Sequence, residues 1–488
     1  MTDRQNKIIK ILLWITAIVF LARLVSLGFT PMFDTTEARY AEIGRLMYET
    51  GNWLTPQFDY GVPFWGKPPL SFWATAASFK IFGVNDFAAR LPHFLFMLGI
   101  TILIYFFVKK HLGRMAAAVS AAVLSTITAF IYLAGGVMTD PAMALWVTLA
   151  MIAFYNAIFG QERRKLWSYL LFASIGLGII TKGPLILVIS GIPMLLMILF
   201  KNKWREMFRT IPWITGIALM LIISLPWYIM AERATPGFIE YFIIGEHFMR
   251  YVVSGWTGDL YGYGRGGYPG QMIVFWLQSL MPWLIWIAVM LFSKCFLRFL
   301  FSRELIKNDF LLFIMMNIAT PLIFFSLSRN VVPNYVLMIL PPSAIIISWL
   351  ICKNDNDEPK LGKFKFFAGL NITLFAAIIA VGALYPKWSA DVGRSDRFLV
   401  KTYLAERTDD SAPLFYFWNN RSYSSLFYSD GKILQTENLA DIRAAAANGK
   451  KVFVIVQRAK KSELLELKGM QKDIVTSGKK TVLVKLWI

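Results

Sequence analysis

The sequence predicts a polytopic α-helical membrane protein with about 11 to 13 transmembrane helices, amphipathic helices in its outer loops and a small soluble α/β domain at its C-terminal end. Three observations lead to this fold class. Of the 488 residues, 57% are hydrophobic and only 16% are charged, which lies outside the composition of soluble globular domains. Apolar runs of roughly 17 to 25 residues recur along the chain, and a helix satisfies its own backbone groups in lipid. After residue 386 these runs give way to short strand-like and helix-like segments.

We expect about eleven membrane spans from the apolar runs. The first, residues 8–28, follows Arg4, Lys7 and Lys10. It lacks a convincing small-residue cleavage site before Thr30, which predicts an uncleaved anchor rather than a signal peptide. The other spans are expected at residues 91–108, 115–134, 137–159, 166–180, 183–200, 210–230, 268–292, 310–327, 331–351 and 366–386.

The charges of the loops predict the orientation, because loops rich in Lys and Arg remain in the cytoplasm. The N-terminus and the loops at 109–114, 161–165, 201–209, 293–307 and 352–365 form the basic set. The complementary outer set is 29–90, 135–140, 181–184, 231–267, 328–330 and the segment after residue 386. We therefore expect a multi-pass membrane protein with its N-terminus in the cytoplasm and its C-terminal segment on the outer side of the membrane.

The segment after residue 386 predicts a second domain. Residues 413–418, 451–457 and 481–488 are strand-like, and 437–448 and 461–471 between them are helix-like. We expect a transmembrane domain over residues 1–386 and a soluble α/β domain on the outer side over residues 387–488. The transmembrane domain would carry a first outer loop at 29–90, with surface helices, and a later one at 231–267.

Charge and cysteine content limit the kinds of partner. The net charge of +20 fits contact with anionic lipid or a phosphate-bearing substrate, and equally fits loops that follow the positive-inside rule. Cys295 and Cys352 both fall beside loops expected in the cytoplasm, so no disulfide is expected. The chain has no CxxC or HExxH spacing, and we expect no cofactor and no metal. Membrane lipids are expected partners, nucleic acid is not, and a monomer is expected.

The position of the ionisable residues argues against a transporter or channel. From the second span onward the apolar runs hold essentially no Asp, Glu, Lys or Arg near their centres. Ion-coupled transporters usually need polar groups near the midplane of the membrane or a charged pathway. Any chemistry is therefore expected at the outer membrane–water boundary.

The first outer loop carries a dense acidic cluster in "FDTTEARYAEI" (33–43). Apolar positions at helical spacing predict an amphipathic helix here. Asp34 and Glu37 have the spacing of a capping box, in which Asp34 would cap free N–H groups and Glu37 would reach back. Either carboxylate is also a candidate for catalysis, and the sequence leaves these alternatives open.

Other candidate site residues share the outer face. Lys67 stands in "GKPP" beside two prolines that favour a rigid, extended segment. Taken singly, each candidate has an ordinary explanation as a solvated lysine, a helix cap or an interfacial aromatic. Together, carboxylates and cations at one rim can accept a proton from a hydroxyl and stabilise a departing phosphate. The remaining candidates of this face are Asp140, His247, Arg250, Arg329 and Tyr335.

Several of these segments resemble bacterial membrane glycosyltransferases of the GT-C superfamily. They are "TTEARYAEIGRLMYETGNWLTP", "GVPFWGKPPLSFW", "FGVNDFAARLP", the "TDP" before the fourth span and "GEHFMRY". The chain looks similar to the lipid A 4-amino-4-deoxy-L-arabinose transferases and to enzymes like the protein O-mannosyltransferases. The resemblance implies transfer of a sugar from undecaprenyl phosphate to an acceptor, without a nucleotide sugar and without an evident metal requirement. It also implies a location in the bacterial inner membrane, with the active site and the C-terminal α/β domain in the periplasm.

The resemblance also implies roles for individual residues. Lys67 matches the lysine expected to hold the donor phosphate, and Arg39, Arg250 and Arg329 are expected to assist it. Tyr40, His247 and Tyr335 match substrate-binding positions, and Asp140 matches the aspartate of the second outer loop. Glu37, Asp34 and Asp140 are the expected catalytic carboxylates.

Three positions depart from the family pattern. Thr36 stands where the aminoarabinose branch has an aspartate, Gly66 where it has a glutamate, and Phe64 where it has an aromatic hydroxyl. These changes favour another sugar, with a hexosamine as one candidate. The expected acceptor is lipid A or another cell-envelope glycolipid. The alternatives are a protein or glycan acceptor, or a flippase for lipid-linked sugars.

Overall fold

The computed structural model describes residues 2–254, 256–262, 267–291, 307–355, 358–407, 412–417, 422–447, 450–465, 467 and 469–488. Most of the basic loop expected at 293–307, including Cys295, lies outside the described residues. The chain divides into two compact units, each assembled from three stretches. The first unit comprises Met1–Val25, Asn52–Ala74 and Leu91–Leu374, and the second comprises Ser26–Gly51, Thr75–Arg90 and Phe375–Ile488.

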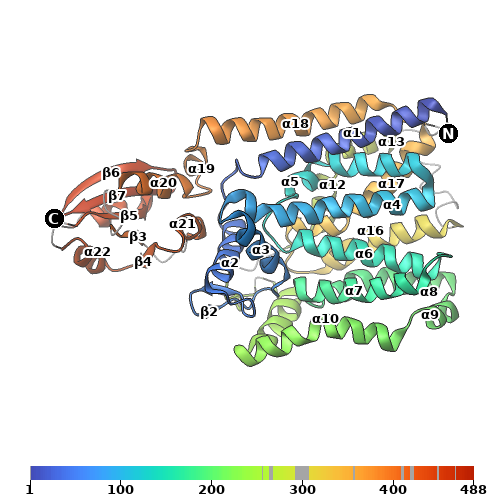
Figure 1. Cartoon of the computed structure of the whole chain (residues 1–488), viewed down its shortest axis with the longest axis horizontal. Helices are drawn as coiled ribbons and strands as arrows, with labels where there is room; N and C mark the ends of the chain where they lie inside the picture. The colour runs from blue at the N-terminus through green and yellow to red at the C-terminus, as the bar shows by residue number, and fades with distance from the viewer. Residues whose placement is uncertain are drawn as a thin grey trace. The chain divides into compact units, whose positions relative to one another are not determined.

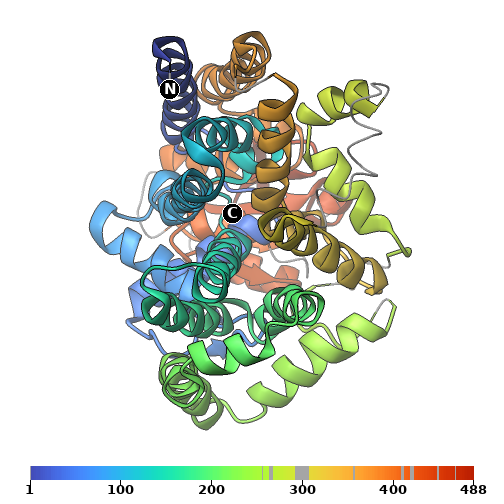
Figure 2. The ribbon, with the colours of Figure 1, turned by 90° about the vertical axis from the view of Figure 1, so that its right-hand side faces the viewer.

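The first unit is helical (Figure 1). Within it, α6 packs against α7 and α7 against α10, and Figure 2 shows the long helices nearly end-on. Its helices, including three with residues that belong to the second unit, are α1 (Asp3–Ser26), α3 (Leu70–Phe82), α4 (Asp86–Thr126), α5 (Thr128–Leu133), α6 (Asp140–Ile158), α7 (Arg164–Lys182), α8 (Leu185–Lys201), α9 (Trp204–Thr210), α10 (Trp213–Ala234), η1 (Glu240–Met249), α11 (Arg250–Val252), α12 (Gln271–Ser279), α13 (Trp283–Leu291), α16 (Asp309–Leu327), η2 (Pro333–Met338) and α17 (Leu340–Asn354). The helix α18 (Leu361–Leu384) also crosses from the first unit to the second.

Six helices in the described residues are long and apolar enough to cross a membrane: α1, α4, α6, α10, α16 and α18. The pair α12 and α13 passes the same test together, with a bend of 101° between them. The expected spans 91–108 and 115–134 both start within α4, whose helical geometry is interrupted at Gly113, where φ is 88°. The helix α7, with 19 residues, and the shorter helices α8 and α17 overlap three further expected spans. The predicted fold class of a polytopic helical membrane protein is confirmed.

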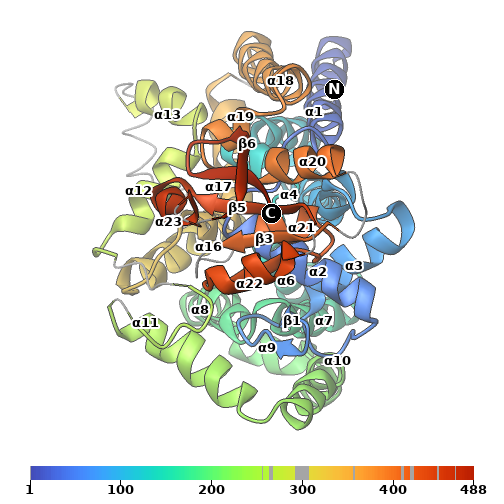
Figure 3. The ribbon, with the colours of Figure 1, turned by 90° about the vertical axis from the view of Figure 1, so that its left-hand side faces the viewer.

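The second unit contains a five-stranded mixed sheet, seen in Figure 3. The strand order is β4-β3-β5-β7-β6, with β3 parallel to β4 and β5, and β7 antiparallel to β5 and β6. The strands are β3 (Leu414–Phe417), β4 (Leu434–Thr436), β5 (Val452–Gln457), β6 (Gln471–Ser477) and β7 (Thr481–Trp487). The helices are α2 (Thr36–Thr50), α19 (Trp388–Asp391), α20 (Arg397–Glu406), α21 (Tyr423–Tyr428), α22 (Leu439–Ala445) and α23 (Lys461–Leu465), with the short η4 (Arg458–Lys460).

Successive side chains along each strand point to opposite faces of this sheet, and both faces are buried. Val452, Val454 and Val456 pack on one face with residues of α22 and α23. Phe453 and Ile455 pack on the other face with residues of α19 and α20. The three strand-like segments predicted here are confirmed as β3, β5 and β7. The segment 461–471 was expected to be helical, but its helix ends at Leu465 and β6 begins at Gln471.

The helix predicted in the first outer loop is α2, and it is buried over most of its length. Its buried residues include Glu42 and Arg45, whose side chains form an ion pair with N–O distances of 2.8 Å. Arg45 also pairs with Glu49 one turn on. Burial of a charged pair is tolerable because each charge neutralises the other. This helix is therefore packed within the second unit along much of its surface.

Candidate functional site

The loop before α3 places Lys67 in the first unit. The loop follows the short ladder of β1 (Gln57–Asp59) with β2 (Val62–Pro63). Tyr261 fixes it at two points: the hydroxyl donates to the carbonyl of Pro63 at 3.0 Å and accepts from the backbone N–H of Trp65 at 2.9 Å. Pro68 and Pro69 then restrict the backbone immediately after Lys67. The sequence expectation of a rigidly presented lysine agrees with this geometry.

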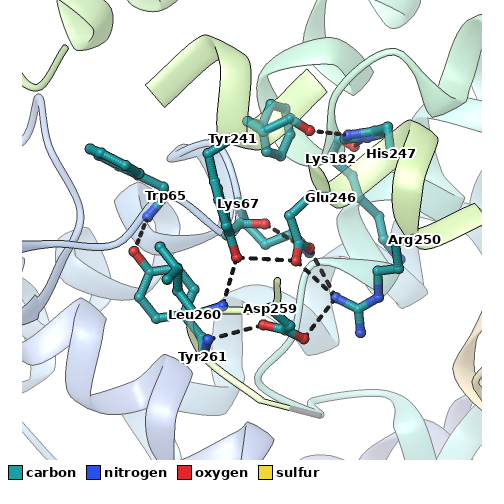
Figure 4. Close-up of polar contacts among 12 residues, drawn as sticks. Trp65, Lys67, Lys182, Tyr241, Glu246, His247, Arg250, Asp259, Leu260 and Tyr261 are labelled. Atoms are coloured by element: carbon teal, nitrogen blue, oxygen red, sulfur yellow. Dashed lines mark hydrogen bonds and ion pairs between the residues drawn. The ribbon is translucent and has the colours of Figure 1, made fainter. Parts of the chain in front are cut away.

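Glu246 is the centre of a charged cluster that includes Lys67 (Figure 4). The Nζ of Lys67 donates to Glu246 Oε2 at 2.8 Å, and Arg250 Nη1 donates to both carboxylate oxygens at 3.0 Å. Arg250 also pairs with Asp259 at 3.3 Å. The side chain of Glu246 is 2% exposed, whereas those of Lys67 and Arg250 are 17% and 27% exposed. Two partly accessible cations therefore converge on one buried carboxylate.

The electrostatic surroundings keep Glu246 ionised. Burial alone raises the pKa of this carboxyl, but the charges of Lys67 and Arg250 outweigh burial and lower its pKa to about 2. The hydroxyl of Tyr241 adds a long hydrogen bond to Glu246 Oε1 at 3.4 Å and accepts from the N–H of Leu260 at 3.1 Å. Burial raises the pKa of Tyr241, so it remains a neutral donor. Glu246 is thus a carboxylate at physiological pH.

Lys182 connects three of the predicted site residues in the same unit. Its Nζ donates to Asp140 Oδ1 at 2.6 Å and lies 4.3 Å from the centre of the Tyr335 ring. Its backbone carbonyl oxygen lies 3.1 Å from His247 Nε2. Both residues are labelled in Figure 4. Both Lys182 and Asp140 are buried. This lysine therefore brings Asp140, His247 and Tyr335 into one neighbourhood.

His247 lies in η1, a ten-residue π-helix that also carries Glu246. Its Nδ1 lies 2.8 Å from the carbonyl oxygen of Phe242. Burial is the largest effect that lowers the pKa of His247, and repulsion from the charge of Lys67 lowers it further. Both effects favour the neutral imidazole. Gly183, with φ of 80°, allows this close packing, because a Cβ there would lie 2.7 Å from the imidazole ring. His247 is thus held between Phe242 and the end of α7.

The acidic residues of the first loop lie in the second unit. Glu37 Oε1 accepts from Arg90 Nε at 2.9 Å, and Oε2 accepts from the backbone N–H of Phe33 at 3.2 Å. The Phe33 contact confirms that Glu37 reaches back towards the start of its helix. Arg90 is 2% exposed and also donates to backbone carbonyls of Leu27 and Pro31. Glu37 is therefore held by a buried arginine.

The predicted capping role of Asp34 is wrong. The N-cap of α2 is Thr35, and no side chain caps this helix. Asp34 instead accepts from the backbone N–H of Ser424 at 3.0 Å and from the Ser424 hydroxyl. Burial and the neighbouring charge of Asp396 raise the pKa of Asp34 to about 7, against hydrogen bonds from Ser424 that lower it. Long-range contacts with the C-terminal segment thus replace the local cap.

The remaining predicted residues are more scattered. Arg39 lies over the rings of Tyr40 and Tyr423, with its guanidinium carbon 5.4 and 5.8 Å from their centres. Arg329 has an exposed side chain, and its backbone N–H donates to the carbonyl of Tyr251 at 3.1 Å. Arg39 and Tyr40 belong to the second unit and Arg329 to the first. The structure thus joins Lys67 to Arg250 through Glu246, and Asp140, His247 and Tyr335 through Lys182.

Sequence reasoning missed Glu246, Lys182, Asp259 and Arg90. Glu246 had a detectable signal, because it is an acidic residue four positions before Arg250, the spacing of an ion pair on one helix face. Lys182 stands at the end of an apolar helix, where a buried lysine needs a carboxylate partner. In the part of the chain that the structure describes, no group of three or more His, Cys, Asp or Glu is arranged to hold a metal ion.

Comparisons with known proteins find similar sequences over most of the chain. Residues 8–242 match the family model described as dolichyl-phosphate-mannose-protein mannosyltransferase. Curated relatives named undecaprenyl phosphate-alpha-4-amino-4-deoxy-L-arabinose arabinosyl transferase include one from Serratia proteamaculans, 26% identical over 75% of this chain and 64% of the relative. Another, from Enterobacter sp., is 29% identical over 67% of this chain and 56% of the relative. The predicted resemblance to the GT-C glycosyltransferases is confirmed.

Two solved membrane-protein structures share the fold of this chain. ArnT from Cupriavidus metallidurans, crystallised bound to undecaprenyl phosphate, matches with a TM-score of 0.77 at 17% identity over 97% of both chains. The apo oligosaccharyltransferase of Archaeoglobus fulgidus matches with a TM-score of 0.50 at 12% identity, over 92% of this chain and 70% of that one. The sequence matches to the relatives from Serratia and Enterobacter cover less than two thirds of those proteins' own length.

Proposed function

We propose that this protein transfers a sugar from undecaprenyl phosphate to an acceptor at the periplasmic face, most simply lipid A or another envelope glycolipid. The names of the curated relatives support a donor linked to undecaprenyl phosphate. The shared fold with a structure bound to undecaprenyl phosphate agrees with that donor. The departures at Thr36, Phe64 and Gly66 favour a sugar other than aminoarabinose, with a hexosamine as the candidate.

The observation that carries this proposal is the convergence of Lys67 and Arg250 on Glu246, with distances of 2.8 and 3.0 Å. Both cations retain some exposure, so a phosphate can approach them from solvent or lipid. Charge-assisted hydrogen bonds from lysine and arginine are the usual way in which proteins hold a phosphate. In the transfer they stabilise the negative charge that develops on the leaving group.

The chemistry then requires one bond exchange. The bond between the anomeric carbon of the sugar and the phosphate oxygen breaks, and a bond forms between that carbon and an acceptor oxygen. If the acceptor is a hydroxyl, a carboxylate accepts its proton; if it is an ionised lipid A phosphate, no proton transfer is needed. Undecaprenyl phosphate leaves with the electron pair of the broken bond.

Each predicted site residue keeps a proposed role in this reaction. The catalytic carboxylates are Glu37, Asp34 and Asp140; the donor phosphate is held by Lys67, Arg39, Arg250 and Arg329; and the substrate is bound by Tyr40, His247 and Tyr335. We also propose the orientation argued from the loops, with the N-terminus in the cytoplasm and the site in the periplasm. The boundary between a transmembrane domain at 1–386 and a periplasmic domain at 387–488, and a monomeric state, belong to the same proposal.

Transfer from radiolabelled undecaprenyl-phosphate sugar in proteoliposomes tests the function. Lys67→Ala should lower turnover by about 100-fold or more, because it removes a charged donor from the leaving group. Lys80→Ala, at an exposed lysine of α3, is the matched control and should keep full turnover. Full turnover by the Lys67 variant would contradict the assignment.

Mass spectrometry of the same lipids separates the alternatives. A new sugar on lipid A supports the favoured acceptor. An unchanged lipid A profile, with label on protein or another glycan, identifies the alternative acceptor class. Movement of the labelled lipid across the bilayer without a new glycosidic bond would instead indicate a flippase.

A further inference from the structure

Glu246 occupies the place between Lys67 and Arg250 where a bound anion would meet both cations. All three contacts are short, at 2.8 Å to Lys67 and 3.0 Å from Arg250 to each carboxylate oxygen. Glu246 is 2% exposed and remains ionised, so its negative charge is a fixed part of the site. A phosphate that binds these cations must therefore share them with Glu246.

The reaction proposed above changes the charge of the group at this place. The donor is a phosphodiester, which carries one negative charge. The product is a phosphomonoester, whose second ionisation near pH 6 gives it about −1.5 to −2 charges at neutral pH. Two unopposed cations would hold the more highly charged product more tightly than the donor, because Coulomb attraction rises with charge.

We propose that Glu246 is a positioning residue that directs Lys67 and Arg250 to one place and offsets part of their charge, so that polyprenyl phosphate leaves after transfer. The inference rests on the proposed function, since it assigns the same cations to the donor phosphate. Glu246 acts through these cations and does not touch the reacting bond. Asp259 contributes in the same sense at the same Nη1 of Arg250, at a longer distance of 3.3 Å.

Binding of undecaprenyl phosphate to the full chain in detergent tests the proposal directly. Glu246→Gln keeps an oxygen that accepts from Lys67 but removes the charge, and it should bind undecaprenyl phosphate roughly tenfold more tightly than the wild type. Glu246→Asp keeps the charge and should bind close to the wild-type affinity. The matched control Glu240→Gln, at an exposed glutamate of the same helix, should leave affinity unchanged.

Kinetics distinguish charge control from a structural role. For Glu246→Gln we expect a first turnover at least as fast as in the wild type, followed by slower steady-state turnover because release limits the cycle. Loss of a merely structural residue would slow the first turnover as well. Equal or weaker binding of undecaprenyl phosphate by Glu246→Gln, or a slower first turnover, would overturn the proposal.

Two further measurements keep the result interpretable. If Glu246→Gln does not fold, Asp259→Asn replaces it and should tighten binding by a smaller factor of roughly threefold; unchanged affinity in that variant would then overturn the proposal. If the wild type itself fails to bind undecaprenyl phosphate, the proposed function fails, whereas wild-type binding without tightening in the variants rejects only the role of Glu246.

Discussion

Arg90 Nε donates to Glu37 Oε1 at 2.9 Å, and this arginine is almost completely buried. The pair joins the start of α2 to the start of α4 within the second unit. A buried arginine requires a carboxylate partner, because an unpaired charge in the interior is strongly unfavourable. Glu37 therefore has a structural task, whatever part it takes in catalysis.

Glu37→Gln should lower the free energy of unfolding by about 3 to 5 kcal/mol, because it removes the carboxylate that is hydrogen-bonded to the buried Arg90. Chemical denaturation of the purified protein measures this change. Glu437→Gln, at an exposed glutamate, serves as the control and should change stability by less than about 0.5 kcal/mol. Unchanged stability with turnover lowered about 100-fold would instead identify Glu37 as mainly catalytic.

Asp34→Asn should stabilise the protein in alkaline solution, where the wild-type carboxylate is buried and charged. The pKa of Asp34 is raised from 3.8 to about 7, by burial first and by Asp396 second. At a pH between 3.8 and about 7, the folded chain holds a proton on Asp34 that the unfolded chain has lost. The contribution of Asp34 to the free energy of unfolding is therefore fully present below about pH 4 and is lost as the pH rises to about 7. Asparagine resembles the protonated acid and does not titrate.

The difference in melting temperature between Asp34→Asn and the wild type should therefore grow from about zero at pH 4 to a few degrees at pH 8. Thermal unfolding across this range measures it. Asp473→Asn, at an exposed aspartate of β6, should show no such growth. A difference that stays constant from pH 4 to pH 8 would contradict the burial of a protonated Asp34.

Gly183→Ala should disturb the neighbourhood of Lys182. Gly183 has φ of 80° and ψ of −161°, a conformation that is nearly restricted to glycine, and an added Cβ would lie 2.7 Å from the ring of His247. We expect a loss of about 1 to 3 kcal/mol of stability and lower turnover, measured by thermal unfolding and the transfer assay. Gly191→Ala has open space around its Cβ in α8 and should be neutral or stabilising by about 0.5 to 1 kcal/mol.

The helices of the fold were predictable because membrane helices follow from a local property, the length of an apolar run. Every expected span coincides at least in part with a helix in the described residues. The break at Gly113 and the bend between α12 and α13 were less accessible, since they depend on backbone conformation. The strands β4 and β6 were missed because they are short or partly exposed and lack a continuous apolar pattern.

The candidate site was predictable only in its residue types. Lys67 and Arg250 could be chosen from their motifs, but Glu246, which joins them, is 179 residues from Lys67. Asp34 shows the opposite case, because its local spacing favours a cap while Ser424, 390 residues away, takes its carboxylate. Long-range ion pairs and hydrogen bonds depend on the packed fold and leave no periodic pattern in the sequence.

The second unit draws on three separated stretches of the chain, and its first-loop residues Asp34 and Arg39 lie against α21 near the C-terminal end. This interleaving bears on how the protein can be engineered. A chimaera that replaces only the C-terminal segment with that of a relative would pack α2 against side chains that do not complement its own. A workable exchange must transfer residues 26–51, 75–90 and 375–488 as one set. When related proteins are compared, we expect a sequence change in one of these stretches to be accompanied by matching changes in the other two.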